Sequence, residues 1–253
     1  MKIFIVLLIA FFTLTSCGII KNLTSSKEEK KEEKPEKKEE VTRDDKKEEK
    51  TESKEKSSGG VTEIIMKDFD KNDLPSDVKY QGSIINGKRW SDKNGENIVI
   101  LTITKEHKSG KKGGEGEDMM NRELYAYQYI KKSDGWSQLW KVNDLINECP
   151  VSLTLNFLSG SLTVTDLNKD GIGETTFLYE LCCRGDVSPC DMKLIMHEGE
   201  KKYAVRGTRK LFVDGGWQGG EMKVDKSFDD APSGFLEYAK EQWNNYKTEK
   251  LGK

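Results

Sequence analysis

The chain has 253 residues, 34% of them charged, and a formal net charge of −2. Residues 60–253 carry 28 Lys and Arg against 31 Asp and Glu. Because nucleic-acid-binding proteins need a concentrated basic face, this balance argues against a nucleic-acid partner.

Residues 1–16 have the layout of a secretory signal peptide. Lys2 precedes an apolar run over residues 3–15, which is shorter than the roughly 20 residues that a membrane-spanning helix needs. The run ends in Leu14-Thr15-Ser16-Cys17, which looks like a bacterial lipobox. We therefore expect Cys17 to be lipidated and residues 17–26 to form the lipidated N-terminus. A plain signal peptide or a membrane anchor is the alternative.

Lipidation would hold the protein at a membrane, because several acyl chains anchor a protein stably and one chain does so only marginally. Residue 18 is Gly rather than Asp, so the usual signal for retention in the inner membrane is missing. The sequence predicts an outer-membrane location, at the cell surface or otherwise on the periplasmic face. The acidic patch Lys27-Glu28-Glu29 favours surface display.

Residues 27–60 are predicted to be a disordered, charged linker. Residues 27–56 hold 12 basic and 13 acidic side chains and one large apolar side chain, Val41. Such a segment cannot bury enough apolar surface to offset the entropy lost on ordering. The linker ends in Ser57-Ser58-Gly59-Gly60, which is typical of a flexible joint.

Residues 61–253 are predicted to form one globular domain, long enough for a well-buried core. Alternating or β-branched sequence predicts strands at residues 97–104, 123–130, 151–157, 162–165, 175–181, 192–197, 202–206, 210–213 and 221–225. Ser159-Gly160 predicts a hairpin between two of them. The Lys- and Gly-rich residues 106–118 predict a mobile loop.

Two helices are predicted in this domain. Residues 142–148 fit a short helix that Pro150 stops. Residues 233–251 fit an amphipathic helix, with helix-start residues Asp230, Pro232 and Ser233 and an apolar stripe of Leu236, Ala239, Trp243 and Tyr246. The expected fold is mainly β, of the α+β class: a single antiparallel β domain with a C-terminal amphipathic helix.

Residues 166–174 resemble the start of a calcium-binding loop. Counted from Asp166, oxygen-bearing side chains stand at positions 1, 3, 5 and 9, and Gly171 stands at position 6. The residue at position 7 would bind the ion through its backbone carbonyl. The predicted ligands are Asp166, Asn168, Asp170, Ile172 and Glu174. Position 12 is Phe177, so the bidentate Glu of an EF-hand is missing. The loop would hold a structural calcium ion or be an ordinary turn.

Four cysteines follow Cys17 in the chain, and an exported domain can keep them as disulfides. Four cysteines allow three pairings. Because adjacent residues of a strand face opposite ways, Cys182 and Cys183 should have different partners. We predict the pairs Cys149–Cys183 and Cys182–Cys190. A zinc site lacks the usual CxxC spacing here.

Aromatic residues suggest a ligand surface. Tyr125, Tyr127 and Tyr129 share one face of a predicted strand, and Trp217 lies in a Gly-rich turn. Aromatic rings of this kind can stack on sugars, but alternate aromatics in a strand also serve cross-strand packing. Arg184-Gly185-Asp186 matches the integrin-binding tripeptide, although a local structural role is the expected one.

Several sequence runs, taken together, resemble a family of Bacteroidota lipoproteins named "surface polysaccharide biosynthesis protein". They lie within roughly residues 80–207 and are Trp90–Asn97, Leu124–Tyr127, Trp140–Asp144, Cys149-Pro150, Thr163–Ile172, Cys183–Pro189, Lys193–Gly199 and Lys202–Ala204. This chain departs from the family pattern by adding Cys182 and Cys190. The resemblance implies a link to surface glycan and supplies no catalytic residues.

Three functional hypotheses follow. The first is a non-catalytic, lipid-anchored protein that supports assembly or retention of surface polysaccharide, with the membrane, the polysaccharide or envelope proteins as partners. The second is a glycan-active enzyme whose two carboxylates, roughly 5 to 10 Å apart, are brought together by folding. The third is an adhesin module that binds glycan or host molecules. No hydrolase, phosphate-binding or dinucleotide motif is present in the sequence.

Overall fold

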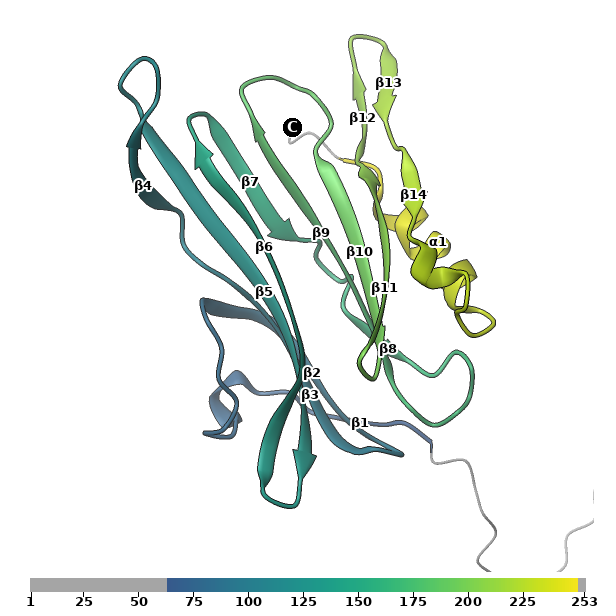
Figure 1. Ribbon diagram of the computed structural model, residues 1–253. Helices are drawn as coiled ribbons and strands as arrows, with labels where there is room; N and C mark the ends of the chain where they lie inside the picture. The colour runs from purple at the N-terminus through teal and green to yellow at the C-terminus, as the bar shows by residue number, and fades with distance from the viewer. Residues whose placement is uncertain (1–62, 250–253) are drawn as a thin grey trace, which may run out of the picture. The chain divides into compact units, whose positions relative to one another are not determined.

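The computed structural model describes residues 63–249, and the predicted signal peptide, Cys17 and linker lie outside them. The described residues form antiparallel sheets and one C-terminal α-helix (Figure 1). The predicted fold class is therefore confirmed. Within residues 63–249, no helix is both long and apolar enough to cross a membrane.

Residues 63–249 contain fourteen strands and one α-helix. The strands are β1 (Ile65–Lys67), β2 (Ser83–Asp92), β3 (Gly95–Ile103), β4 (His107–Lys112), β5 (Asp118–Lys132), β6 (Gly135–Cys149), β7 (Ser152–Phe157), β8 (Thr163–Thr165), β9 (Glu174–Arg184), β10 (Asp191–Glu198), β11 (Lys201–Thr208), β12 (Lys210–Val213), β13 (Gly216–Gly219) and β14 (Met222–Val224). The helix α1 spans Phe235–Tyr246, and two 3-10 turns span Lys71–Asp73 and Lys226–Phe228.

The strands form two six-stranded sheets and one small hairpin. The first sheet has the order β1-β2-β3-β5-β4, with β6 on the other edge of β5. The second sheet has the order β14-β11-β10-β9-β7, with β8 also paired to β9. The two-stranded sheet is the β12–β13 hairpin. In each large sheet, one long strand therefore pairs along one edge with two other strands that lie end to end: β5 pairs with β3 and β4, and β9 pairs with β7 and β8.

The two large sheets pack face to face around a common core. The first sheet contributes Trp90, Leu101, Leu124 and Trp140, and the second contributes Phe177 and Ile195, among others. The outer face of the second sheet is covered by α1, through Phe235, Ala239 and Trp243. The outer face of the first sheet is covered by the segment that contains Phe69, Leu74 and Val78. Both sheets are thus buried on two faces, which explains the near-continuous apolar sequence of β3.

The predicted helix at 142–148 is wrong, because these residues belong to β6. This strand pairs with β5 along nearly its whole length. Val142 and Ile146 are both buried against the second sheet, and their spacing of four residues fits one face of a strand as well as one face of a helix. Twelve residue pairs between β6 and β5 decide the outcome, as tertiary context routinely overrides local propensity.

The predicted hairpin at Ser159-Gly160 is also wrong. β7 pairs with Tyr179–Arg184, whereas β8 pairs with Glu174–Thr176. The chain leaves β9 at Tyr179 and rejoins the same edge at Thr176, so that β7 and β8 lie end to end, and Gly160 in the turn between them has φ 78°. Turn chemistry predicts the change of direction but not the pairing partner.

Two further predictions need adjusting. The predicted loop at 106–118 contains β4, which pairs with β5. The helix α1 is shorter than residues 233–251, and Gly234, with φ 90°, stands at its N-cap without a side-chain hydrogen bond. Phe235 is buried in place of Leu236, which lies at the margin of the apolar stripe.

Candidate functional site

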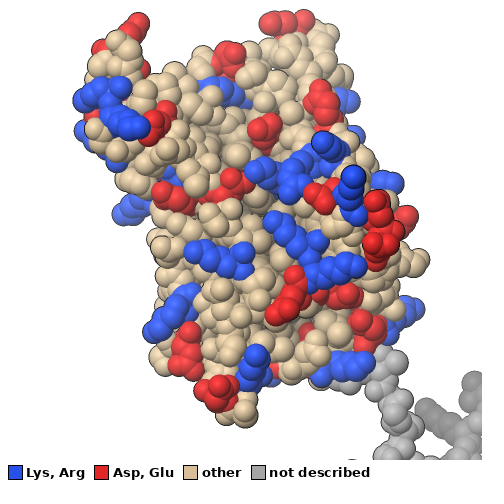
Figure 2. Space-filling model, in the orientation of Figure 1, with Lys and Arg blue, Asp and Glu red and all other residues tan. Residues whose placement is uncertain are grey.

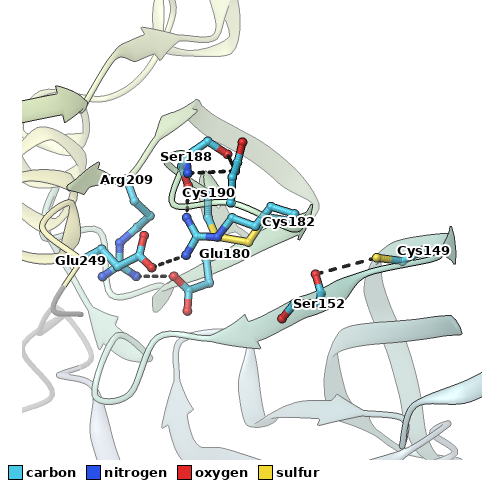
Figure 3. The surroundings of a disulfide bond; sticks show 10 residues. Cys149, Ser152, Glu180, Cys182, Ser188, Cys190, Arg209 and Glu249 are labelled. Carbon is cyan, nitrogen blue, oxygen red and sulfur yellow. Dashed lines mark hydrogen bonds and ion pairs between the residues drawn. A yellow bond between two sulfur atoms is a disulfide. The ribbon is translucent and has the colours of Figure 1, made fainter. Parts of the chain in front are cut away.

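The two disulfides are Cys149–Cys183 and Cys182–Cys190, as predicted. Their Cα atoms lie 5.7 and 5.0 Å apart, respectively. Adjacent residues of a strand point to opposite faces of the sheet. Cys183 is bonded to Cys149 at the end of β6, and Cys182 is bonded to Cys190, directly before β10 (Figure 3). Four of the five cysteines are thus bonded to each other, and Cys17 lies outside the described residues.

A charge network surrounds the second disulfide (Figure 3). The Arg184 guanidinium lies 2.5 Å from a carboxylate oxygen of Glu249, and Arg209 lies 2.7 Å from Glu180. Asp186 accepts hydrogen bonds from the amide and the hydroxyl of Ser188. Arg184-Gly185-Asp186 therefore has the local structural role expected for it, and the arginine is largely enclosed.

The predicted calcium-binding residues lie together in the connection between β8 and β9. Asp166 Oδ2 accepts from the Gly171 amide at 3.2 Å, Asn168 from the Asp170 amide at 3.1 Å, and Asp170 from the Ile172 amide at 2.8 Å. These bonds set the loop into a tight turn with Lys169 and Gly171 at positive φ. Within residues 63–249, no group of three His, Cys, Asp or Glu side chains is arranged to hold a metal ion.

Glu174 is the most unusual carboxyl group of this loop. Its side chain is fully buried, and Oε2 accepts hydrogen bonds from the Thr165 hydroxyl and the Leu167 amide, both at 3.0 Å. Oε1 has no hydrogen-bond partner, and neither has the buried Oδ1 of Asp166. Burial raises the pKa of Glu174 to about 7, since an apolar environment disfavours the charged form. A cation beside these oxygens would offset the cost of burying their charge.

Glu198 is a member of this cluster that sequence reasoning missed. It stands directly opposite Glu174 in the β9–β10 pairing, and its carboxylate accepts a hydrogen bond from the side-chain amide of Asn168 at 2.6 Å. Burial and the charge of Asp170 raise its pKa. No signal in the sequence links it to the loop, because only the register of β9 with β10 brings the two together.

The loop is also fixed to the first sheet. The buried Asp92 side chain accepts from the Trp90 indole at 2.9 Å and from the Gly173 amide at 3.1 Å. The Lys93 amide donates to the Gly171 carbonyl at 2.8 Å. A Cβ atom at Gly173 would lie 2.6 Å from the Trp90 indole nitrogen, so only glycine allows this close approach. Trp90, Asp92 and residues 171–173 therefore join the two sheets.

Tyr125, Tyr127 and Tyr129 of β5 serve mainly in packing. The rings of Tyr125, Tyr127 and Tyr129 stack along β5, and Tyr127 and Tyr129 are buried beneath the segment before β2. The Tyr127 hydroxyl accepts from the Gln81 amide, and the Tyr129 hydroxyl donates to a backbone carbonyl. Their ring faces are covered, and Tyr125 is half-buried with the Lys141 ammonium 4.7 Å from its ring centre.

Trp217, by contrast, is 55% exposed on the β12–β13 hairpin. Its cross-strand partner is Phe212, 51% exposed, with the ring centroids 5.2 Å apart. The Lys210 ammonium lies 4.7 Å from the Trp217 ring. Phe212 and Lys210 were not singled out from the sequence, although alternation in residues 210–213 places them on one face. Exposed aromatic side chains can contribute to an interaction surface.

Two hollows border the segment before β2. One, of about 320 Å³, is open and lined by Phe69, Asp70, Lys71 and residues 84–87. The other, of about 90 Å³, is lined in part by Asp68, Asp70 and Asp73. Asp70 accepts hydrogen bonds from both the amide and the side chain of Asn72, which makes it a cap of the first 3-10 turn.

No protein-family model, curated protein or solved structure matches this chain. The resemblance to the surface-polysaccharide lipoproteins therefore rests on the sequence runs alone.

Proposed function

We propose that this protein is a lipid-anchored component of a bacterial cell envelope, held in the outer membrane through Cys17. The observation that supports this most is the pairing of all four cysteines of residues 63–249 in two disulfides. Structural disulfides persist in oxidising compartments outside the cytoplasm. They fit a domain that is exported behind a lipobox, with Cys17 as the remaining thiol of the chain.

The proposed role is non-catalytic support of surface polysaccharide assembly or retention. Two of the sequence runs that carry the family resemblance meet in space, since the Lys93 amide donates a hydrogen bond to the Gly171 carbonyl at 2.8 Å. The resemblance thus involves residues that hold the two sheets together. A stable sandwich carried on a charged linker suits a scaffold or retention role at the envelope.

We further propose that the Asp166–Glu174 loop binds a structural calcium ion. The side chains of Asp166, Asn168, Asp170 and Glu174, with the Ile172 carbonyl, supply oxygen ligands of the type that calcium prefers. Support comes from the buried, unpartnered oxygens of Asp166 and Glu174. The ion would stiffen the contact between the loop and the first sheet.

Labelling with a palmitate analogue tests the anchor. The wild-type protein should incorporate the label and fractionate with membranes, and Cys17→Ser should do neither. Incorporation into Cys17→Ser would overturn the proposal. Protease treatment of intact cells then separates surface display, where residues 63–249 are released, from a periplasmic location, where they are protected.

Deletion of the gene tests the link to polysaccharide. The deletion strain should retain less cell-bound surface polysaccharide, and the wild-type gene should restore it. Unchanged cell-bound and shed polysaccharide would exclude the role. The anchor proposal would survive that result, because it is measured separately by palmitate labelling.

A second candidate function, a glycan-binding adhesin module, is favoured by the exposed Phe212–Trp217 pair. Replacing both residues with Ala should abolish binding of the protein to glycan-coated surfaces while leaving its thermal unfolding midpoint nearly unchanged, since both side chains are half exposed. Retained binding would exclude this pair as the site.

A further inference from the structure

A row of side chains crosses the second sheet at right angles to its strands. Lys193 of β10 stands directly opposite Tyr179 of β9 and Arg206 of β11, and Arg206 stands directly opposite Lys223 of β14. Register partners share one face of a sheet. Three cationic side chains therefore follow one another across three neighbouring strands, at strand spacings of about 4.8 Å.

This row lies on the face that packs against the first sheet, but beyond the packed core. Ile195 and Ala204, two residues along the same strands from Lys193 and Arg206, are buried between the sheets. At the row itself the first sheet contributes Asp144, which pairs with Lys193 and accepts from the Tyr179 hydroxyl at 3.1 Å. Arg206 has a side chain 47% exposed.

Two more features extend the cationic surface. Lys223 is exposed at the edge strand of the sheet, and Lys202 is exposed on β11, four residues before Arg206 and on the same face. Figure 2 shows Lys and Arg side chains gathered over this part of the molecule, with carboxylates between them. The cations of the cluster are Lys193, Lys202, Arg206 and Lys223.

The positive charge of this cluster is only partly compensated. Asp144 pairs with Lys193, and Asp225 pairs with Arg206 at 2.7 Å. Within residues 63–249, Lys202 and Lys223 form no ion pair. Partial desolvation of the Lys202 ammonium and the charges of Arg206 and Lys193 lower the pKa of Lys202, against the opposing effect of Asp144 and Asp225. Like charges directly opposite one another destabilise a sheet. This arrangement therefore lowers the stability of the fold, and a bound anion would offset the repulsion.

We propose that Lys193, Lys202, Arg206 and Lys223 bind the anionic groups of an acidic polysaccharide, such as its uronate, sulfate or phosphate groups. The inference rests on the proposed function, and it names the chemical class of the partner. The cations are spread over three strands and about 13 Å along β11, which suits a polymer with repeated charges better than one small anion. The interspersed Asp144 and Asp225, and the balanced charge of the domain, do not suit nucleic acid.

Binding of the full, lipidated chain in detergent to defined polymers tests the proposal. Polygalacturonate and dextran sulfate should bind, with an affinity that falls as salt is raised, and neutral dextran should not. The double variant Lys202→Gln and Lys223→Gln should bind about tenfold more weakly, which corresponds to about 1.4 kcal/mol. Its thermal midpoint should equal or exceed that of the wild type, because it loses like-charge repulsion and no ion pair.

The matched control is Lys132→Gln with Lys240→Gln, which removes the same charge from two exposed lysines elsewhere. It should bind like the wild type. Equal weakening in both double variants, equal binding of neutral dextran, or binding only to phosphatidylglycerol vesicles or duplex DNA would each overturn the inference. Cys17 labelling is independent of these measurements, so a failure here would leave the proposed anchor standing.

Discussion

The imidazole of His197 stacks on the indole of Trp140 across the interface between the two sheets, with ring centroids 4.2 Å apart and planes 16° from parallel. His197 is 4% exposed, and neither of its ring nitrogens has a hydrogen-bond partner. Burial, with a smaller contribution from the charge of Lys202, lowers the pKa of His197 to about 3. The ring is therefore neutral in the folded protein at physiological pH.

This histidine should destabilise the fold at acid pH, whereas the raised pKa of Glu174, about 7, works in the opposite direction between about pH 7 and pH 4.5. The unfolded chain binds a proton at His197 below about pH 6.5, whereas the folded chain does so only near pH 3. Its contribution to stability is therefore complete above pH 6.5 and is lost as the pH falls toward 3. At pH 5 the loss should be about 2 kcal/mol. Urea unfolding of wild type and His197→Phe between pH 4.5 and 7.5 checks this: the stability of the variant relative to the wild type should rise by about 2 kcal/mol from pH 7.5 to pH 5.

The control for that experiment is His107→Gln, because the His107 side chain is 50% exposed. Its pH profile should run parallel to that of the wild type. A His197→Phe profile that also runs parallel to the wild-type profile below pH 6.5 would contradict the assignment of this effect to the His197 ring.

The two disulfides should differ in their contribution to stability. Cys149–Cys183 closes a separation of 34 residues and Cys182–Cys190 one of 8. Loop-closure entropy predicts losses of about 3.8 and about 2.5 kcal/mol when each pair is replaced by Ala. Denaturant unfolding of the two double variants measures both values. A larger loss for the 182–190 pair would show that strain or local packing, and not chain entropy, dominates.

Removing one partner of the Arg209–Glu180 pair should lower the free energy of unfolding strongly, whereas replacing both partners with apolar residues should lower it little. Both side chains are largely buried, 10% and 16% exposed, and Arg209 also donates to the Thr248 carbonyl at 2.9 Å. Arg209→Ala leaves the Glu180 carboxylate buried without its partner, so the free energy of unfolding should fall by about 3–5 kcal/mol. Arg209→Met combined with Glu180→Met should recover most of this loss. If the double variant lost as much stability as the two single variants together, the buried-charge explanation would be contradicted.

Calcium binding should appear as a chelator effect on thermal unfolding. At saturating calcium the midpoint should rise above its value in chelator, because a ligand that binds only the folded state stabilises it. Asp170→Ala should abolish the difference. Asp134→Ala, in the exposed β5–β6 turn, is the control and should keep it. Equal midpoints with and without calcium in the wild type would show that the loop binds no stabilising calcium ion.

The parts of the fold that depend on local pattern were predictable from the sequence. β-branched alternation predicts β3 and β9. The opposite orientation of adjacent strand residues excludes a Cys182–Cys183 bond but does not choose between the two remaining pairings, one of which the structure contains. Residues 142–148 were misassigned, because apolar residues four apart fit a helix and a strand equally. Only the 15-residue partner strand β5 distinguishes the two.

The candidate sites were less accessible to sequence reasoning. Glu198 joins Glu174, and Lys193 joins Arg206 and Lys223, only through the register of neighbouring strands. The tyrosines of β5 satisfied the pattern for an exposed aromatic face, yet the segment around Val78 covers two of them. Which face of a strand is covered depends on distant chain segments, and local alternation carries no information about them.

Because Cys182 and Cys183 are neighbours, the two disulfides create two covalent rings that share a single peptide bond and together enclose residues 149–190. A protease that cuts once inside either ring separates no fragment from the rest of the chain. Nicked molecules would still migrate as one species without reductant. The double ring therefore keeps the domain in one piece after the first cleavage.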